Sequence, residues 1–130
     1  MRLALDTNAY SDAARGEESA VDVLATADRV YVPFVVLGEL RAGFAVGTKG
    51  RRNEAMLARF LDSPRVETLF ADEQTTHHYA RLFSHLRKKG TPVPTNDLWI
   101  AALVVQHDLQ LLSRDAHFEK LPQVARIGRR

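Results

Sequence analysis

Short continuous runs of apolar or β-branched residues recur along this chain. Each run is too short for a helix but long enough for a buried strand. The runs cover residues 3–5, 30–32, 66–70, 109–112 and 124–127. The second run, Val-Tyr-Val, is β-branched and aromatic and ends at Pro33. The hydrophobic pattern therefore predicts five strands.

Between these runs, apolar residues recur at the three- and four-residue spacing of amphipathic helices. The spacing predicts helices over residues 8–15, 17–27, 34–45, 53–61, a long stretch capped by Asp72 and ended by Gly90, and 97–107. Either Thr95 or Asn96 is expected to cap the last helix. Residues 98–105 are apolar on nearly every side, so that helix belongs inside the domain.

The alternation of strands and helices is typical of a parallel sheet with helices on both faces. It predicts a single α/β domain over residues 1–130, a three-layer α/β/α sandwich around a central, mainly parallel five-stranded sheet. The carboxyl ends of parallel strands meet at one edge of the sheet, where ligands bind in open α/β folds.

Composition narrows the class of protein. Of 130 residues, 45% are hydrophobic and 26% are charged, as in a folded globular domain. There is no cysteine, and the longest apolar stretch, 98–105, is too short to span a bilayer. The N-terminus lacks a signal-peptide layout, because Asp6 interrupts it at once. We therefore expect a cytoplasmic protein with no membrane association.

Four carboxylates stand at comparable places in the predicted fold. Asp6 ends the first strand, Glu39 lies on the helix after the second, Asp97 is in the first turn of the most apolar helix, and Asp115 follows the fourth strand. If the first and fourth strands are neighbours, the four converge. Their repulsion is relieved by a divalent cation. With no cysteine and no histidine placed with them, Mg²⁺ or Mn²⁺ is favoured over zinc.

Each carboxylate also has a structural explanation: Asp6 and Asp97 as helix caps, Glu39 as a solvated residue, and Asp115 in an Asx turn. Their occurrence together is the stronger indication, because a pair of bound cations can activate water against a phosphodiester. Polar neighbours expected to orient the carboxylates or their waters are Thr7, Asn8, Asn96 and Ser113.

Four segments of the chain resemble PIN-domain ribonucleases, and VapC toxins of bacterial toxin–antitoxin pairs in particular. They are Leu-Asp-Thr-Asn (5–8), Glu-Leu-Arg-Ala-Gly (39–43), Asn-Asp-Leu-Trp-Ile-Ala-Ala (96–102) and Ser-Arg-Asp-Ala-His-Phe (113–118). They keep the order and spacing of that family across residues 3–118. Ser113 stands where the family often has threonine, which keeps the hydroxyl.

The resemblance implies a Mg²⁺-dependent endoribonuclease whose acidic residues match Asp6, Glu39, Asp97 and Asp115. It also implies a homodimer and a cognate VapB-like antitoxin, forming a heterotetramer or a larger complex. The alternative is a non-catalytic PIN-fold binding module that acts through an antitoxin and DNA complex.

Basic residues suggest where RNA would bind. The net charge is only +2, but basic residues cluster at 49–52, 87–89 and 126–130. Such clusters bind phosphate backbones, or are simply solvated helix ends. The candidates for guiding RNA are Arg41, Lys49, Arg51, Arg52 and Arg114. Arg41 and Arg114 flank acidic positions, so a local salt bridge or an antitoxin contact is an alternative for either.

Three other enzyme classes fit poorly. A serine hydrolase built from Ser113, Asp115 and His117 would place all three within five residues, without the Gly-x-Ser-x-Gly turn. A haloacid dehalogenase phosphatase needs an aspartate where this chain has Asn8. Zinc on the long helix is disfavoured, because its histidines (77, 78 and 85) do not form an i, i+4 pair.

Overall fold

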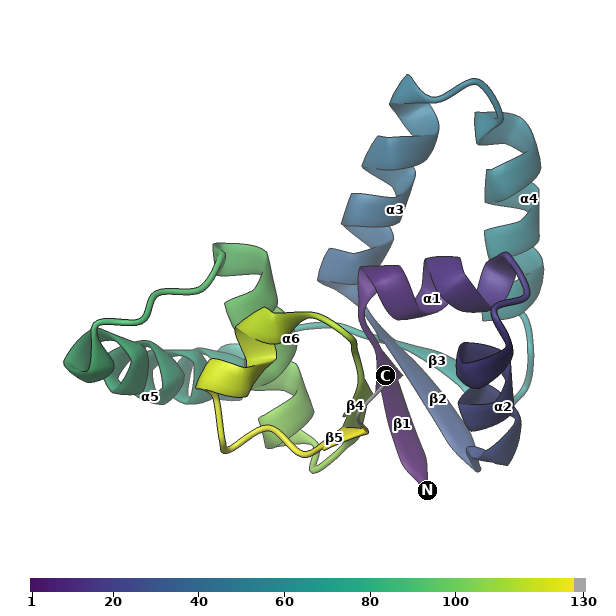
Figure 1. Cartoon of the computed structure of the whole chain (residues 1–130). Coiled ribbons are helices and arrows are strands. Elements are labelled where there is room, and N and C mark those ends of the chain that lie inside the picture. The colour runs from purple at the N-terminus through teal and green to yellow at the C-terminus, as the bar shows by residue number, and fades with distance from the viewer. Residues whose placement is uncertain (128–130) are drawn as a thin grey trace.

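The structure, a computed structural model, describes residues 1–127 and contains one five-stranded sheet (Figure 1). The strands are β1 (Arg2–Leu5), β2 (Arg29–Pro33), β3 (Val66–Leu69), β4 (Gln110–Leu112) and β5 (Arg126–Ile127). Their order is β3-β2-β1-β4-β5, and every pair is parallel. The predicted three-layer α/β/α fold is confirmed. Residues 128–130, the end of the predicted domain and of its last basic cluster, lie outside the described residues.

Helices lie on both sides of the sheet, as predicted (Figure 1). They are α1 (Thr7–Ala14), α2 (Glu18–Thr26), α3 (Phe34–Val46), α4 (Gly50–Leu61), α5 (Glu73–Lys89) and α6 (Thr95–Gln106), with a 3-10 turn, η1, at Ala116–Lys120. Within the described residues, none of these helices has both the length and the apolar character needed to cross a bilayer.

Two helix starts differ from the prediction by two residues or more. Helix α4 begins at Gly50, three residues earlier than expected, at a tight approach to α3. A Cβ atom on Gly50 would lie 2.5 Å from the carbonyl oxygen of Phe44, so only glycine fits. Helix α6 begins at Thr95 after Pro94, without a side-chain cap. The predicted cap by Thr95 or Asn96 is therefore wrong, because both residues are already inside the helix.

The central strand β1 decides which loops meet. In its register with its neighbours, Leu3 pairs with Val30 of β2 and Leu5 pairs with Leu112 of β4. Leu3 and Leu5 are fully buried, as expected for a parallel strand covered on both faces. The predicted convergence of the acidic residues required β1 and β4 to be neighbours, and this pairing is confirmed.

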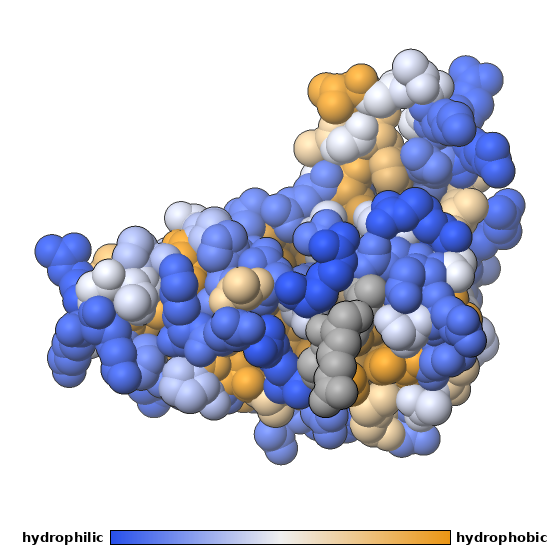
Figure 2. Space-filling model, in the orientation of Figure 1, coloured by the Kyte–Doolittle hydropathy of each residue, from blue (hydrophilic) through white to orange (hydrophobic). Residues whose placement is uncertain are grey.

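Helices α3 and α4 form an arm that projects beyond the carboxyl ends of the strands (Figure 1). Figure 2 shows hydrophobic residues along the α3 side of this arm and hydrophilic residues along the α4 side. Val46, at the end of α3, is 88% exposed. Hydrophobic residues exposed in this way favour contact with another macromolecule.

Candidate active site

Asp6 lies where β1 ends and α1 begins. Its side chain caps α1 by accepting a hydrogen bond of 2.8 Å from the backbone N–H of Ala9. Its other carboxylate oxygen accepts a hydrogen bond from the hydroxyl of Ser113, just after β4. Both Asp6 and Ser113 are buried. The predicted cap and the predicted contact with a polar neighbour therefore occur together, on opposite oxygens of one carboxylate.

Glu39 reaches the same edge of the sheet from the second turn of α3. One carboxylate oxygen accepts a hydrogen bond from the hydroxyl of Thr7, in the first turn of α1. The other accepts from the side-chain amide of Asn96 at 3.4 Å, in the first turn of α6. Asn8, also predicted to orient the carboxylates, is exposed on α1. Three helices thus meet at Glu39, although Thr7 and Asn96 are far apart in the sequence.

The side chain of His117 contacts both Asp97 and Asp115. Nδ1 of His117 lies 2.8 Å from Oδ2 of Asp97 and 3.0 Å from Oδ1 of Asp115. The ligand atoms of these three side chains lie within 4.8 Å of one another. Asp115 also caps η1 through the N–H of His117, at 2.9 Å. The expectation that no histidine accompanies the carboxylates is therefore wrong, because the cap of η1 brings His117 to them.

The four carboxylates form an acidic cluster, defined here as Asp6, Glu39, Asp97 and Asp115, that is electrostatically unfavourable. Burial raises the pKa of Asp6, against hydrogen bonds from Ser113 and Ala9 that lower it, and the charges of Asp115 and Asp97 raise it further. Burial likewise raises the pKa of Asp97, and the charge of Asp115 adds to the increase.

The five candidate RNA-binding residues are not all brought to this cluster. Arg41 forms a two-point ion pair with Glu54 on α4, at 2.8 and 3.1 Å, which is the local salt bridge weighed as an alternative. The next three candidates lie at the start of α4: Lys49 directly precedes the helix, and Arg51 and Arg52 are in its first turn. Only Arg114 adjoins the acidic cluster, between Ser113 and Asp115 in the chain.

Sequence reasoning missed two residues of this region, His117 and Asp12. Asp12 is a buried carboxylate on α1, only 3% exposed, paired with Arg15 and Arg114. Its spacing from Ala9 places it on the buried face of α1, and a charge at such a position is a signal that the sequence already contained. For His117, the signal was its place two residues after Asp115.

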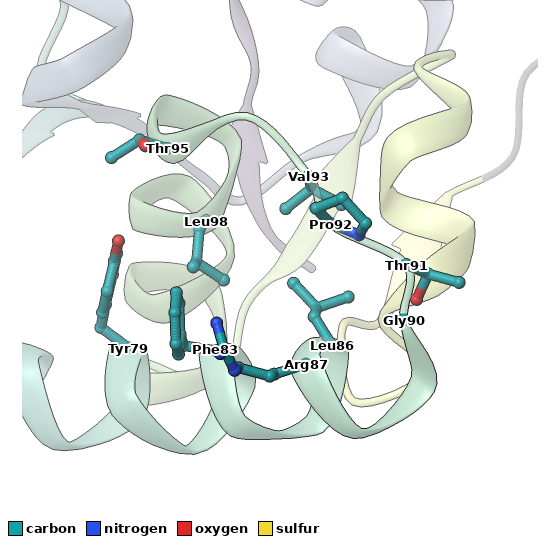
Figure 3. A pocket seen from close by; sticks show the side chains of 10 residues that line it. All are labelled: Tyr79, Phe83, Leu86, Arg87, Gly90, Thr91, Pro92, Val93, Thr95 and Leu98. Atoms are coloured by element: carbon teal, nitrogen blue, oxygen red, sulfur yellow. The ribbon is translucent and has the colours of Figure 1, made fainter.

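The described residues also form an apolar cavity of about 500 Å³ between α5 and α6, apart from the acidic cluster (Figure 3). The side chains of Tyr79, Phe83 and Leu86 on α5 face Leu98 on α6 across it. No member of the acidic cluster lines this cavity. This cavity is therefore separate from the acidic cluster at the carboxyl edge of the sheet.

A sequence model of the PIN domain matches residues 3–124. The chain belongs to the PIN-domain family. The match covers β2 to β4, all of β1 but its first residue, and every residue of the acidic cluster. The family predicted from four short segments is confirmed over nearly the whole length of the chain.

Relatives of this PIN domain include ribonuclease VapC5 of Mycobacterium tuberculosis, 32% identical over 123 residues, or 95% of this chain and 90% of that protein. Ribonuclease VapC4 of the same organism is 36% identical over 93 residues, or 72% of each chain. The structure of VapBC2 from Rickettsia felis, bound to a promoter DNA fragment, contains a chain with a TM-score of 0.86 and 26% identity, covering 98% of both chains. The corresponding values for VapBC-5 of M. tuberculosis are 0.74, 30% and 98% of both chains.

Proposed function

We propose that this protein is a metal-dependent endoribonuclease, the toxin of a VapBC-type toxin–antitoxin pair. The acidic cluster carries the proposal. One carboxylate comes from each of four places at the same edge of the sheet: the β1–α1 junction, α3, α6 and the segment after β4. Ribonuclease activity is supported by the names of the relatives, which align over most of their own length. The cytoplasm is the compartment in which such a toxin would meet RNA.

The donor set fits a divalent cation. The charges of Asp97 and Asp115 raise the pKa of Asp6, and the charge of Asp115 raises the pKa of Asp97; a cation among these carboxylates would remove that repulsion. Mg²⁺ accepts the carboxylates, and Mn²⁺ would also accept the imidazole of His117. Asp6, Glu39, Asp97 and Asp115 would hold the ion. When bound, it supplies Lewis-acid chemistry, lowering the pKa of water and neutralising charge on the phosphate.

The remaining residues of the site position these carboxylates. Ser113 donates to Asp6, while Thr7 and Asn96 donate to opposite oxygens of Glu39. These hydrogen bonds fix the direction in which the lone pairs of each carboxylate point. Nδ1 of His117 lies within hydrogen-bond distance of both Asp97 and Asp115, so the imidazole is placed to position either carboxylate. The chain thus orients its acidic residues before RNA arrives.

The partners we propose are RNA, a VapB-like antitoxin and a second copy of the chain. Antitoxin binding is supported by several structural neighbours that are VapBC complexes, including VapBC2 of R. felis at 26% identity. The apolar α3 side of the arm offers a surface for such a contact (Figure 2). A non-catalytic DNA-tethering module remains the second candidate, because that same neighbour is bound to promoter DNA.

The test is cleavage of end-labelled total RNA by purified, antitoxin-free protein with Mg²⁺, with Mn²⁺ and with EDTA. We expect discrete fragments with metal and none with EDTA. Asp6→Asn should reduce the rate by at least about 100-fold, because a ligand of the cation supports several kcal/mol of charge stabilisation. Asparagine still offers an oxygen to the N–H of Ala9, so α1 should remain capped.

The matched control is Asp72→Asn. Asp72 is also an aspartate that caps a helix, α5, but it is exposed and lies outside the acidic cluster. This variant should cleave RNA at a rate within about twofold of wild type, as expected for a surface site. Equal activity of the Asp6 and Asp72 variants, or cleavage that persists in EDTA, would contradict the proposal. No cleavage by folded wild type with either metal would favour the binding module.

A further inference from the structure

Outside the acidic cluster, Asp12 on α1 is a buried carboxylate that forms ion pairs with two arginines, Arg15 and Arg114. Its side chain is 4% exposed. Oδ2 accepts from Nε of Arg114 at 2.9 Å, and Oδ1 lies 3.5 Å from Nη2 of the same guanidinium. Oδ1 also accepts from Nη2 of Arg15 at 2.5 Å. A buried carboxylate needs such partners, because burial of an isolated charge is strongly unfavourable.

The two arginines remain accessible while Asp12 holds them. The side chains of Arg114 and Arg15 are 49% and 67% exposed. A guanidinium carries five N–H donors, and Asp12 engages only Nε and Nη2 of Arg114. Donors therefore remain for an anion from solvent. Asp12 thus carries one negative charge and contacts two guanidinium groups, each with one positive charge.

Arg114 is fixed beside the acidic cluster by the chain itself. Its neighbour Ser113 donates to Asp6, and its other neighbour Asp115 contacts His117. The hydrogen bond with Asp12 raises the pKa of Arg114, and the charges of Asp6 and Asp115 raise it further. The guanidinium is thus a permanent cation at the margin of a cluster that would otherwise repel a phosphate.

We propose that Asp12 is a positioning residue that holds Arg114 and Arg15 as a two-guanidinium subsite for a backbone phosphate of RNA next to the acidic cluster. The inference rests on the proposed nuclease function. Guanidinium groups match phosphate oxygens with two parallel hydrogen bonds, and a guanidinium held in advance loses less entropy on binding. The position beside the cluster favours RNA over an acidic segment of an antitoxin as the occupant.

The effect of Asp12→Asn on RNA affinity has opposite directions depending on whether Asp12 acts by its charge alone or by positioning the arginines. By electrostatics alone, Asp12→Asn removes a negative charge and should strengthen RNA binding. If Asp12 positions the arginines, the same variant should weaken RNA binding instead. Asp12→Glu retains the carboxylate and should restore part of the affinity. An ion pair that only joins α1 to the segment after β4 predicts neither the weaker binding of Asp12→Asn nor the partial restoration by Asp12→Glu.

The experiment measures fluorescence anisotropy of a labelled single-stranded RNA of random sequence, with every variant made in an Asp97→Asn background so that the RNA stays intact. Arg114→Gln should weaken binding about tenfold and reduce the slope of log K against log salt by about 0.7, the value for one phosphate contact on a single strand. Arg15→Gln should have the same effect on the slope. Arg81→Gln, an exposed arginine on α5, is the matched control and should change neither quantity.

A double-mutant cycle completes the test. Asp12→Asn should weaken binding when Arg114 is present and weaken it less when Arg114 is already glutamine, because part of its effect passes through that residue. RNA binding by Asp12→Asn that equals or exceeds that of the parent overturns the subsite, as does an unchanged salt slope in Arg114→Gln. Loss of antitoxin binding with unchanged RNA binding also overturns it.

The nuclease proposal and the subsite fail separately. If wild type cleaves RNA with Mg²⁺ but the arginine variants bind RNA like the parent, the nuclease stands and the subsite is wrong. If the variants lose RNA affinity as expected but wild type cleaves nothing, the subsite stands and the catalytic function is wrong.

Discussion

Within residues 1–127, two aspartates cap α-helices, and the two show opposite electrostatics. Asp6 caps α1 and is buried, and burial raises its pKa above the usual 3.8. Asp72 caps α5 in a capping box and is exposed, and hydrogen bonds from Gln106 and Thr75 lower its pKa below the same value. The local motif is the same in both. The surroundings of each carboxylate decide whether its charge is tolerated or favoured.

This difference in pKa distinguishes Asp72, which only caps a helix, from Asp6, which caps a helix and also belongs to the acidic cluster. At Asp72, every hydrogen bond stabilises the ionised carboxylate and the fold together. At Asp6, the cap is retained although burial and two other carboxylates oppose its charge. A fold that keeps an unfavourable cluster of this kind is typical of a functional site.

Apart from RNA cleavage, we expect the largest difference between the two aspartates in metal affinity, when the hydroxyl that contacts each of them is removed. Ser113 donates to Asp6 and accepts from the N–H of Asp115 at 3.0 Å, so Ser113→Ala should lower the affinity for Mn²⁺ about 10- to 100-fold. Thr75 lies 3.2 Å from Asp72 and 2.6 Å from Gln106, and Thr75→Val should leave that affinity unchanged. Isothermal titration calorimetry measures both.

Ser113→Thr is the control for this pair of variants, because it keeps the hydroxyl and should restore metal affinity. Equal affinities in the alanine variant and in wild type would show that the hydroxyl of Ser113 does not orient the metal ligands.

A smaller effect is expected on thermal stability without metal. In EDTA at neutral pH, Asp6→Asn should raise the melting temperature by roughly 2–4 °C, the shift that about 1 kcal/mol produces in a domain of this size. Asp72→Asn should lower it, because the carboxylate accepts from Thr75 and Gln106. Differential scanning calorimetry provides the comparison. A lower melting temperature for both variants would mean that the acidic cluster is not unfavourable to the fold.

We expect the smallest effect in how the free energy of unfolding of each variant, relative to wild type, depends on pH. The raised pKa of Asp6 means that the folded state binds more protons than the unfolded state, so its contribution to stability falls as pH rises from 3.8 through the folded pKa. The lowered pKa of Asp72 gives the reverse: stability is present above 3.8 and is lost as pH falls through the folded pKa. Urea unfolding in EDTA from roughly pH 3 to 7, wild type against each variant, should show opposite slopes. Parallel slopes would contradict both assignments.

Much of the fold could be read from the sequence, because short apolar runs and helical spacings are local signals. All five strands and all six helices lie within a few residues of their predicted places. The errors arose where neighbours in space decide the outcome. Helix α4 starts early because Gly50 packs against the carbonyl of Phe44, and Asn96 faces Glu39 rather than capping α6.

The candidate site divides in the same way. The sequence by itself determined which carboxylates stand at strand ends and helix starts, because strand and helix boundaries follow from local composition. Only the tertiary structure decided that His117 lies between Asp97 and Asp115, and that Asp12 holds Arg114 from 102 residues away. These contacts depend on the pairing of β1 with β4 and on the close packing that follows. No periodicity along the chain encodes a hydrogen bond between side chains so far apart in it.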